Sequence, residues 1–340
     1  MSQPIADVEL PALDGRSSLG FLAALGLLNV LSWLEQYPVR LSFSDEHGTA
    51  VIHSTLQSLD EIVAKLEAFV ETSAKDSALV GLDPRFPPHP GTGADPLRRP
   101  RDEYRQLAAQ ISKIDSVAGS MWLPHLVTDM AVDEKGRADN TPFAAPSGKQ
   151  NWRSFFSNPL SAVRNNPAYI CEALSGWRRV KGVTGEYLDH HVINSSADDP
   201  EGKSAERGVP GATWLATMAL PLLRLTGDGS NASATLWHQF GRRSFITWPL
   251  WRQPLGVRAV QALIEHPSLS PWPADGELAV SSAAFGPLGV FAVYGAERQR
   301  ISGRNFAGVL APVSMRVERR RRDARSARGG STARAEVLAG

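Results

Sequence analysis

The longest apolar stretch of the chain, Leu19 to Leu34, constrains the fold more than any other feature. Its apolar residues cover nearly every side of a helix, and small residues such as Gly20 and Gly26 permit close packing against neighbours. Asn29 interrupts the stretch, which is also shorter than the segment of about 20 apolar residues that a membrane span needs. The pattern therefore predicts a helix over residues 19–35 that is buried in a protein core, and no membrane association.

Local patterns place this helix in an N-terminal α/β lobe over residues 1–95. Alternating apolar and polar residues predict a hairpin over residues 39–53, with its turn at Gly48. Ser58, followed three residues later by a glutamate, is a capping box and predicts a helix over residues 58–70.

The rest of the chain predicts a second, larger unit and a tail. Prolines and glycines between residues 83 and 100 indicate a connection, after which residues 96–314 read as a mainly helical lobe with late strands. Residues 298–300 read as a basic turn after one of those strands. Residues 315–340 lack apolar periodicity and predict a disordered, arginine-rich tail. We therefore expect an α+β fold, with two mixed lobes in which helices pack on short antiparallel sheets.

The charge of the chain is unevenly distributed. The formal net charge is +1, yet residues 315–340 alone carry a balance of +5, so the remaining 314 residues carry −4. Because the body is slightly acidic, any nucleic-acid binding must depend on local basic patches or on the tail.

A single cysteine, Cys171, excludes an internal disulfide framework and a cysteine-based zinc site. The cysteine lies in an apolar helical run, which favours a core position. The N-terminal residues carry no basic group ahead of an apolar run, so they do not resemble a secretory signal. These features favour a cytoplasmic location.

Common enzyme signatures are absent from the sequence. Ser147-Gly148-Lys149 lacks the upstream glycine and the following hydroxyl residue of a phosphate-binding loop. Ser17 lacks the second glycine of a nucleophile elbow, because Leu19 stands two residues after it and Gly20 comes one residue late, and it is better explained as a helix cap. We expect no catalytic residue, no cofactor and no enzyme activity.

His190-His191, preceded by Asp189, is the one histidine pair of the sequence. Adjacent side chains are expected to point apart, so a metal ion would need distant ligands, for which His125 and His238 are the candidates. Hydrogen-bonded or solvated histidines are the simpler interpretation, and we expect no metal site.

Basic residues next to aromatic residues are the better candidates for function, because arginine and lysine bind phosphates while exposed indoles stack on bases. Tryptophans are more often core residues, and helix-end arginines often only complement the helix dipole. Residues 147–150 can also begin a helix over residues 152–163, whose free amides would face a phosphate together with Lys149. A loop that packs two lobes, with Gln150 bonding backbone, is the alternative. The candidate nucleic-acid-binding residues are Lys149, Gln150, Arg153, Arg178, Arg179, Lys181, Arg242 and Arg243.

Three segments, in order over roughly residues 8–312, together resemble CRISPR-associated proteins of type I-G (formerly I-U) loci. LDGRSSLGFLAALGLLNVL, residues 13–31, is similar to the family's Asn-Pro-Leu-Gly-Phe-Leu-Ala-Ala-Leu-Gly start. TPFAAPSGKQNWRSFF, residues 141–156, is similar to its Thr-Pro-Phe…Ser-Gly-Gln-Gln-x-Phe pattern, with Lys149 where glutamine is commoner. Residues 208–223 and 244–264 are similar to its Trp-Leu-Ala…Leu-Pro-Leu and Trp-Pro-Leu-Trp…Pro-Leu blocks.

The resemblance implies a non-catalytic subunit of a type I CRISPR interference complex in antiviral defence, large-subunit-like or accessory. Its partners would be the other complex subunits, crRNA and target DNA, with no small-molecule substrate. Two alternatives stay open from the residues: an assembly subunit that contacts only protein, and a metal-dependent hydrolase that uses His190 or His191.

Overall fold

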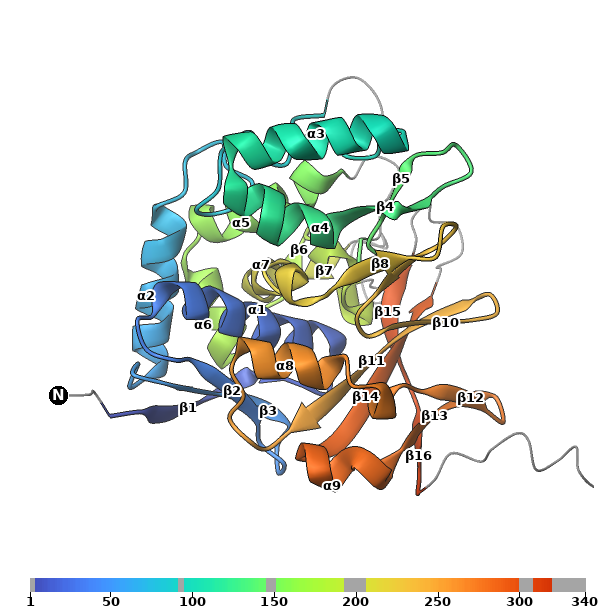
Figure 1. Cartoon of the computed structure of the whole chain (residues 1–340). Coiled ribbons are helices and arrows are strands. Elements are labelled where there is room, and N and C mark those ends of the chain that lie inside the picture. Colours follow the sequence, from blue (N-terminus) through green and yellow to red (C-terminus); the bar gives the residue numbers. More distant parts are fainter. Residues whose placement is uncertain (1–3, 91–94, 145–150, 193–205, 300–307, 320–340) are drawn as a thin grey trace, which may run out of the picture.

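The computed structural model describes residues 4–90, 95–144, 151–192, 206–299 and 308–319 (Figure 1). Its helices and mostly antiparallel sheets form an α+β fold, as the sequence predicts. Across these described residues, no helix combines the length and the apolar character that crossing a membrane requires.

The N-terminal region consists of one sheet and one buried helix, and both follow from local sequence signals. Strands β1 (Ala6–Asp14), β3 (Thr49–Ser54) and β2 (Arg40–Phe43) pair antiparallel in that order. Helix α1 (Ser18–Leu34) begins at Ser17, whose side chain accepts a hydrogen bond from the Gly20 N–H. The predicted helix and hairpin are thus confirmed.

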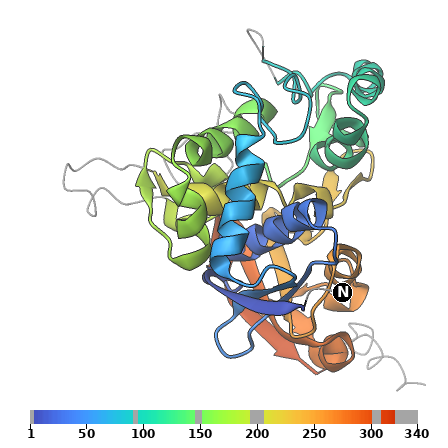
Figure 2. The ribbon, with the colours of Figure 1, turned by 90° about the vertical axis from the view of Figure 1, so that its left-hand side faces the viewer.

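Helix α2 (Leu59–Glu71) confirms the third local prediction. The Ser58 side chain accepts from the Glu61 N–H, whereas the Glu61 carboxylate accepts from the N–H of Gln57, one residue before the expected partner. The helix crosses the outer side of this region next to α6 (Ala168–Ser175) (Figure 2).

Helix α1 packs against α7 (Pro210–Thr217) at a very short distance. A Cβ atom built on Gly26 would lie 1.7 Å from the Leu215 carbonyl oxygen, so only glycine permits this approach. Next to it, the amide of Asn29, a buried residue, donates to the Met218 carbonyl oxygen at 2.8 Å. The small and polar residues inside the apolar stretch therefore determine how the two helices meet.

The middle of the chain is helical and its last helix packs against α7, while a small hairpin extends from it (Figure 1). Its cis peptide bond joins Phe86 to Pro87 in the predicted connection. The elements are α3 (Arg101–Ile114), α4 (Leu123–Leu126), β4 (Val127–Val132), β5 (Ala138–Asn140) and α5 (Trp152–Asn165).

The described C-terminal part contains three sheets. The largest has the order β10-β11-β14-β15 and is antiparallel throughout, the second, β12-β13-β16, contains a parallel pair, β13 with β16, and the third pairs β8 with β9. Helix α8 (Val257–Ile264) and the short α9 (Phe285–Leu288) accompany them. The strands are β8 (Leu225–Gly227), β9 (Ala232–Ala234), β10 (Trp237–Phe240), β11 (Arg243–Trp251), β12 (Trp272–Ala274), β13 (Glu277–Ser281), β14 (Val290–Gln299), β15 (Val309–Val313) and β16 (Met315–Glu318).

Two tryptophans of β11 join the C-terminal sheet to the N-terminal region. The indole N–H of Trp248 donates to the Gly15 carbonyl oxygen at 2.7 Å, and that of Trp251 donates to the Leu41 carbonyl oxygen at 2.8 Å. Their rings pack against Phe21 within one hydrophobic core that runs through the described residues on both sides of position 95. This core therefore contains residues of both expected lobes.

Three local predictions differ from the structure. Arg298 and Gln299, expected in a basic turn, belong to β14, because both residues pair antiparallel with β15. Residues 315–318, expected in the tail, form β16 because they pair with β13. Residues 320–340 lie outside the described part. Cys171, expected in the core, is partly exposed.

Candidate functional site

Three of the predicted cations lie on or beside a small ribbon of two strands that follows α6. Strand β6 (Val180–Lys181) pairs antiparallel with β7 (Arg207–Gly208), which places Arg207 directly opposite Lys181. Gly208 permits the close crossing, because a Cβ atom there would lie 2.8 Å from the Val183 carbonyl oxygen. We call Arg178, Arg179, Lys181 and Arg207 the basic ribbon.

The two arginines before the ribbon are held in different ways. Arg178 is exposed, pairs with the Glu172 carboxylate at 2.8 Å, and lies 5.2 Å from the ring centroid of Tyr169. Arg179 is half-buried and donates to Asp189 Oδ2 at 2.6 Å and to the Arg207 carbonyl oxygen at 3.2 Å. The Arg179 guanidinium is therefore fixed in place, whereas Arg178 is held only by surface contacts.

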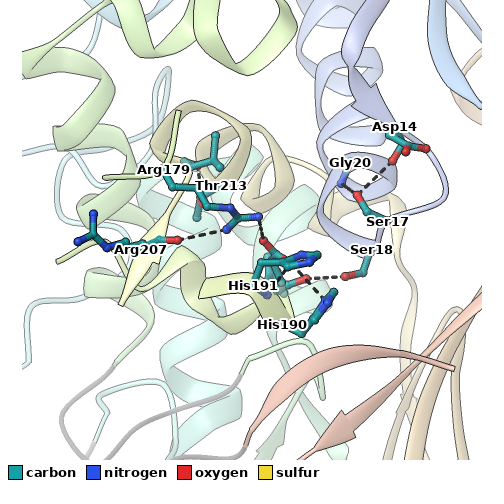
Figure 3. A network of polar contacts seen from close by, with 12 residues as sticks. Asp14, Ser17, Ser18, Gly20, Arg179, His190, His191, Arg207 and Thr213 are labelled. Carbon is teal, nitrogen blue, oxygen red and sulfur yellow. Dashed lines mark hydrogen bonds and ion pairs between the residues drawn. The ribbon is translucent and has the colours of Figure 1, made fainter. Parts of the chain in front are cut away.

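Asp189 anchors a polar network that includes Arg179, His190 and His191, whose side chains are shown in Figure 3. It is 4% exposed, and besides Arg179 it accepts the His191 N–H at 3.1 Å. One residue earlier, the Leu188 carbonyl oxygen accepts the hydroxyl of Ser18 at 2.6 Å. The ribbon is thereby connected to the first turn of α1, at the centre of the core.

Glu186 is buried beside the ribbon in a backbone conformation that favours glycine, with φ at 48°. Burial raises the pKa of Glu186 to about 8, and the hydrogen bond from Thr184 opposes this only in part. Burial, and then the neighbouring His191, lower the pKa of His190. Near neutral pH Glu186 is thus uncharged, and the basic ribbon is not neutralised by that carboxylate.

The turn from Asp189 to His191 also gathers groups that ligate metals. One carboxylate oxygen and one nitrogen from each imidazole lie within 4.8 Å of one another. The distant helpers expected from the sequence do not take part, since His125 bonds the Leu223 carbonyl oxygen and His238 bonds the Thr247 hydroxyl. Within the described residues, this is the one group of three such side chains.

The other predicted arginine pair lies on the β10–β11 hairpin. Arg243 forms two hydrogen bonds of 2.8 Å with the Glu297 carboxylate on β14, which lower the pKa of that glutamate, and it lies over the Phe245 ring. Arg242 is exposed in the turn, next to Gly241 with φ at 60°. The two side chains therefore do not act as a pair.

A polar groove of about 900 Å³ separates this hairpin from the segment after β5. Trp237 lines the groove, and the Arg298 guanidinium lies 5.4 Å from the centroid of its indole ring. The same guanidinium donates to the Pro142 and Phe143 carbonyl oxygens. Lys149 and Gln150 lie outside the described residues.

Arg153, a predicted phosphate ligand, is a buried structural residue. It is 7% exposed and donates to the carbonyl oxygens of Pro84 and Pro87, at 2.9 and 3.0 Å, and of Asp76. These bonds hold the proline-rich connection against α5, so the guanidinium cannot face a phosphate in this fold.

The start of α5 also differs from the expectation of free amides. Asn151 caps the helix and forms a capping box with Ser154. The Trp152 N–H donates to the Asp95 carboxylate. The N–H groups of Trp152 and Ser154 therefore already have partners, Asp95 and the Asn151 side chain, and are unavailable to a phosphate.

Sequence reasoning missed Arg207 and Glu186 as members of the site. Arg207 lies in a polar stretch of the sequence, and only its pairing with β6, across 25 intervening positions, brings it opposite Lys181. Glu186 carried one signal, the pair of nearby glycines Gly182 and Gly185 that suggests an irregular turn. Comparison of the chain with family models and with curated proteins finds no match.

Proposed function

We propose that this protein is a non-catalytic, cytoplasmic subunit of a type I CRISPR interference complex, and that it contributes to binding crRNA or target DNA. The proposal rests on the resemblance of three segments to that family. The observation that supports it best is the convergence of Arg178, Arg179, Lys181 and Arg207 on one ribbon of an otherwise slightly acidic body.

The basic ribbon suits contacts to a phosphate backbone. Lys181 and Arg207 lie opposite each other on neighbouring strands, which brings two cationic residues together on the ribbon. Arg179 is oriented in advance by Asp189, so binding would immobilise little further side-chain freedom. Contacts of this kind position a nucleic acid without reading its sequence, a task that falls to base pairing by the guide.

A second candidate function, assembly without nucleic-acid contact, has an observation of its own. Trp33 and Met121 are 37% and 38% exposed, and the Trp33 ring meets that of Trp122 edge-on. Ile114, the last residue of α3, and Val117, in the connection that follows, are exposed as well. Exposed apolar groups of this kind are typical of surfaces that contact other proteins.

The test is the affinity of the full-length protein for labelled single-stranded RNA and duplex DNA, measured by fluorescence anisotropy between 50 and 300 mM salt. The double substitution Arg178→Ala with Arg179→Ala should weaken binding about tenfold on every sequence. It should also reduce the slope of log affinity against log salt by about 1.5, because each lost phosphate contact contributes about 0.7 to 0.9.

Arg105→Ala with Arg252→Ala is the matched control. Both arginines are exposed and paired with a carboxylate, as Arg178 is, but they lie away from the ribbon. If affinity and slope are the same for both double variants, phosphate binding by the ribbon is refuted. A complex that assembles normally and copurifies without small RNA would then favour the assembly function.

A further inference from the structure

The side chains of Asp189, His190 and His191 converge although they are consecutive in sequence. The chain forms a single 3-10 turn at His190–Val192, so the two imidazoles do not point apart as they would on a strand. Their ring centroids lie 3.7 Å apart, and both Nδ1 atoms face the same carboxylate oxygen, Asp189 Oδ1 (Figure 3). The distances are 3.6 Å for His190 and 3.3 Å for His191.

We propose that these three residues bind a divalent transition-metal ion of the Zn²⁺ class. With metal–ligand bonds of about 2.0 to 2.1 Å, the ligand atoms of a tetrahedral site lie about 3.3 to 3.4 Å apart. Both oxygen–nitrogen distances come close to that edge length, and all the donor atoms lie within 4.8 Å, so small ring rotations complete the geometry. Two imidazoles with one carboxylate select Zn²⁺, Co²⁺ or Ni²⁺ over Mg²⁺ and Ca²⁺.

The surroundings of Asp189 match those of a metal ligand. Its Oδ2 atom accepts from Arg179, and its Oδ1 atom accepts the His191 backbone N–H, so the carboxylate has a fixed orientation. Oδ1 also bonds His191 Nδ1 at 3.3 Å, a contact that a metal ion between the two atoms would replace. Hydrogen-bonding partners behind a ligand orient it and raise metal affinity. His190 and His191 are 35% and 64% exposed, which leaves an entry path for the ion.

The ion would connect the turn to the basic ribbon through Arg179, and it would add positive charge next to it. Three protein ligands leave at least one coordination position for water or for an oxygen of a bound molecule. The inference goes beyond the proposed function and does not depend on it, because metal binding is measured without nucleic acid and without complex partners.

The experiment uses tag-free, full-length protein stripped with chelator and dialysed into metal-free buffer. Titration calorimetry with ZnCl₂ should give one ion per chain, and Co²⁺ should produce visible absorption bands of a low-coordinate site. His190→Ala and His191→Ala should each weaken Zn²⁺ binding about 100-fold or more. Loss of a residue that only hydrogen-bonds to a metal ligand weakens binding about 10- to 100-fold. A large excess of MgCl₂ should not compete.

His47→Ala is the matched control, since His47 is exposed, lies beside a carboxylate of the preceding residue, and belongs to a distant turn. Thermal unfolding followed by circular dichroism checks that all variants are folded. We expect them to fold, because both imidazoles are at least partly exposed and little packing is lost with them. The proposal is wrong if the chain shows no saturable binding of one ion. It is equally wrong if the His190 and His191 variants bind Zn²⁺ as tightly as the His47 variant.

Discussion

The basic ribbon and the β10–β11 hairpin both carry predicted arginine pairs next to aromatic residues, yet they are built in different ways. The hairpin is a regular antiparallel pair in which each residue from Trp237 to Phe240 has one partner on β11. The ribbon has two residues on each strand and is surrounded by backbone in the left-handed region at Gly182, Gly185 and Glu186. Regular pairing disperses the hairpin arginines, while the irregular turns bring the ribbon cations together.

The two regions also bury opposite kinds of titratable group. Beside the ribbon, burial raises the pKa of Glu186 to about 8, and in the hairpin it lowers the pKa of His238 to about 4. Both groups are therefore uncharged near neutral pH, because an uncompensated charge in the interior is costly. The comparison predicts opposite responses to pH, which can be separated by substitution.

The largest effect is expected for Glu186→Gln above neutral pH. The pKa of Glu186 is higher in the folded state than its ordinary value of 4.5, so between pH 4.5 and 8 the folded chain keeps a proton that the unfolded chain has lost. The free energy of unfolding then falls by up to about 1.4 kcal/mol per pH unit as pH rises through this window. Glutamine lacks the ionisation, so the variant should be as stable as the parent near pH 4.5 and more stable at pH 8 and above.

Urea unfolding between pH 4.5 and 9 measures this difference. Glutamine keeps the shape of glutamate and the same left-handed backbone, and Glu277→Gln, at an exposed position, is the control that should give no pH-dependent gain. Parallel stability curves for the parent and Glu186→Gln would show that Glu186 ionises freely, and the uncharged interior of the ribbon region would be refuted.

The fold was predictable wherever its signals are local. The apolar run of α1, the alternation of the first hairpin and the cap at Ser58 depend on neighbours within a few residues, and the structure confirms all three. The joining of both expected lobes into one core was not predictable, because it depends on Trp248 and Trp251 reaching carbonyl groups more than 200 residues away in sequence.

The site was predictable only in part, and one dipeptide explains why. Trp152-Arg153 and Trp177-Arg178 have the same local sequence near a helix end, and both arginines were expected to contact phosphate. Arg153 is buried by carbonyl groups 66 to 77 positions earlier in the chain, whereas Arg178 contacts Glu172 and Tyr169, only six and nine positions earlier, and stays exposed. Burial by distant chain segments decides between the two roles, and no local pattern encodes it.

A smaller effect, of the opposite sign, is expected for His238→Gln at acid pH. The pKa of His238 in the folded state is below its ordinary value of 6.5, so between pH 6.5 and 4 the unfolded chain binds a proton that the folded chain does not. Stability is lost as pH falls through this narrower window, again by up to about 1.4 kcal/mol per unit. Glutamine can keep a hydrogen bond to Thr247, which bonds His238 at 2.9 Å.

Chemical unfolding at pH 7, 5.5 and 4 tests this expectation. The free energy of unfolding of His238→Gln should rise relative to that of the parent at each step down in pH. His47→Gln, at an exposed position, should show no such shift. If the difference in unfolding free energy between His238→Gln and the parent stays constant over the three pH values, His238 takes up its proton as readily in the folded hairpin as in the unfolded chain. The contrast with the ribbon region is then refuted.

The smallest effects are expected for the hairpin arginines, and they sharpen the comparison most directly. Arg243→Ala removes a surface ion pair with Glu297 and should lower the free energy of unfolding by about 0.5 kcal/mol, while Arg242→Ala, for which the described residues supply no ion-pair partner, should leave it unchanged. In the anisotropy assay, each variant should weaken nucleic-acid binding about threefold or less, because the two side chains are not held together toward one phosphate. A loss of tenfold or more for either variant, equal to that of the ribbon double variant, would mean that the bound strand extends over the hairpin and its groove as well.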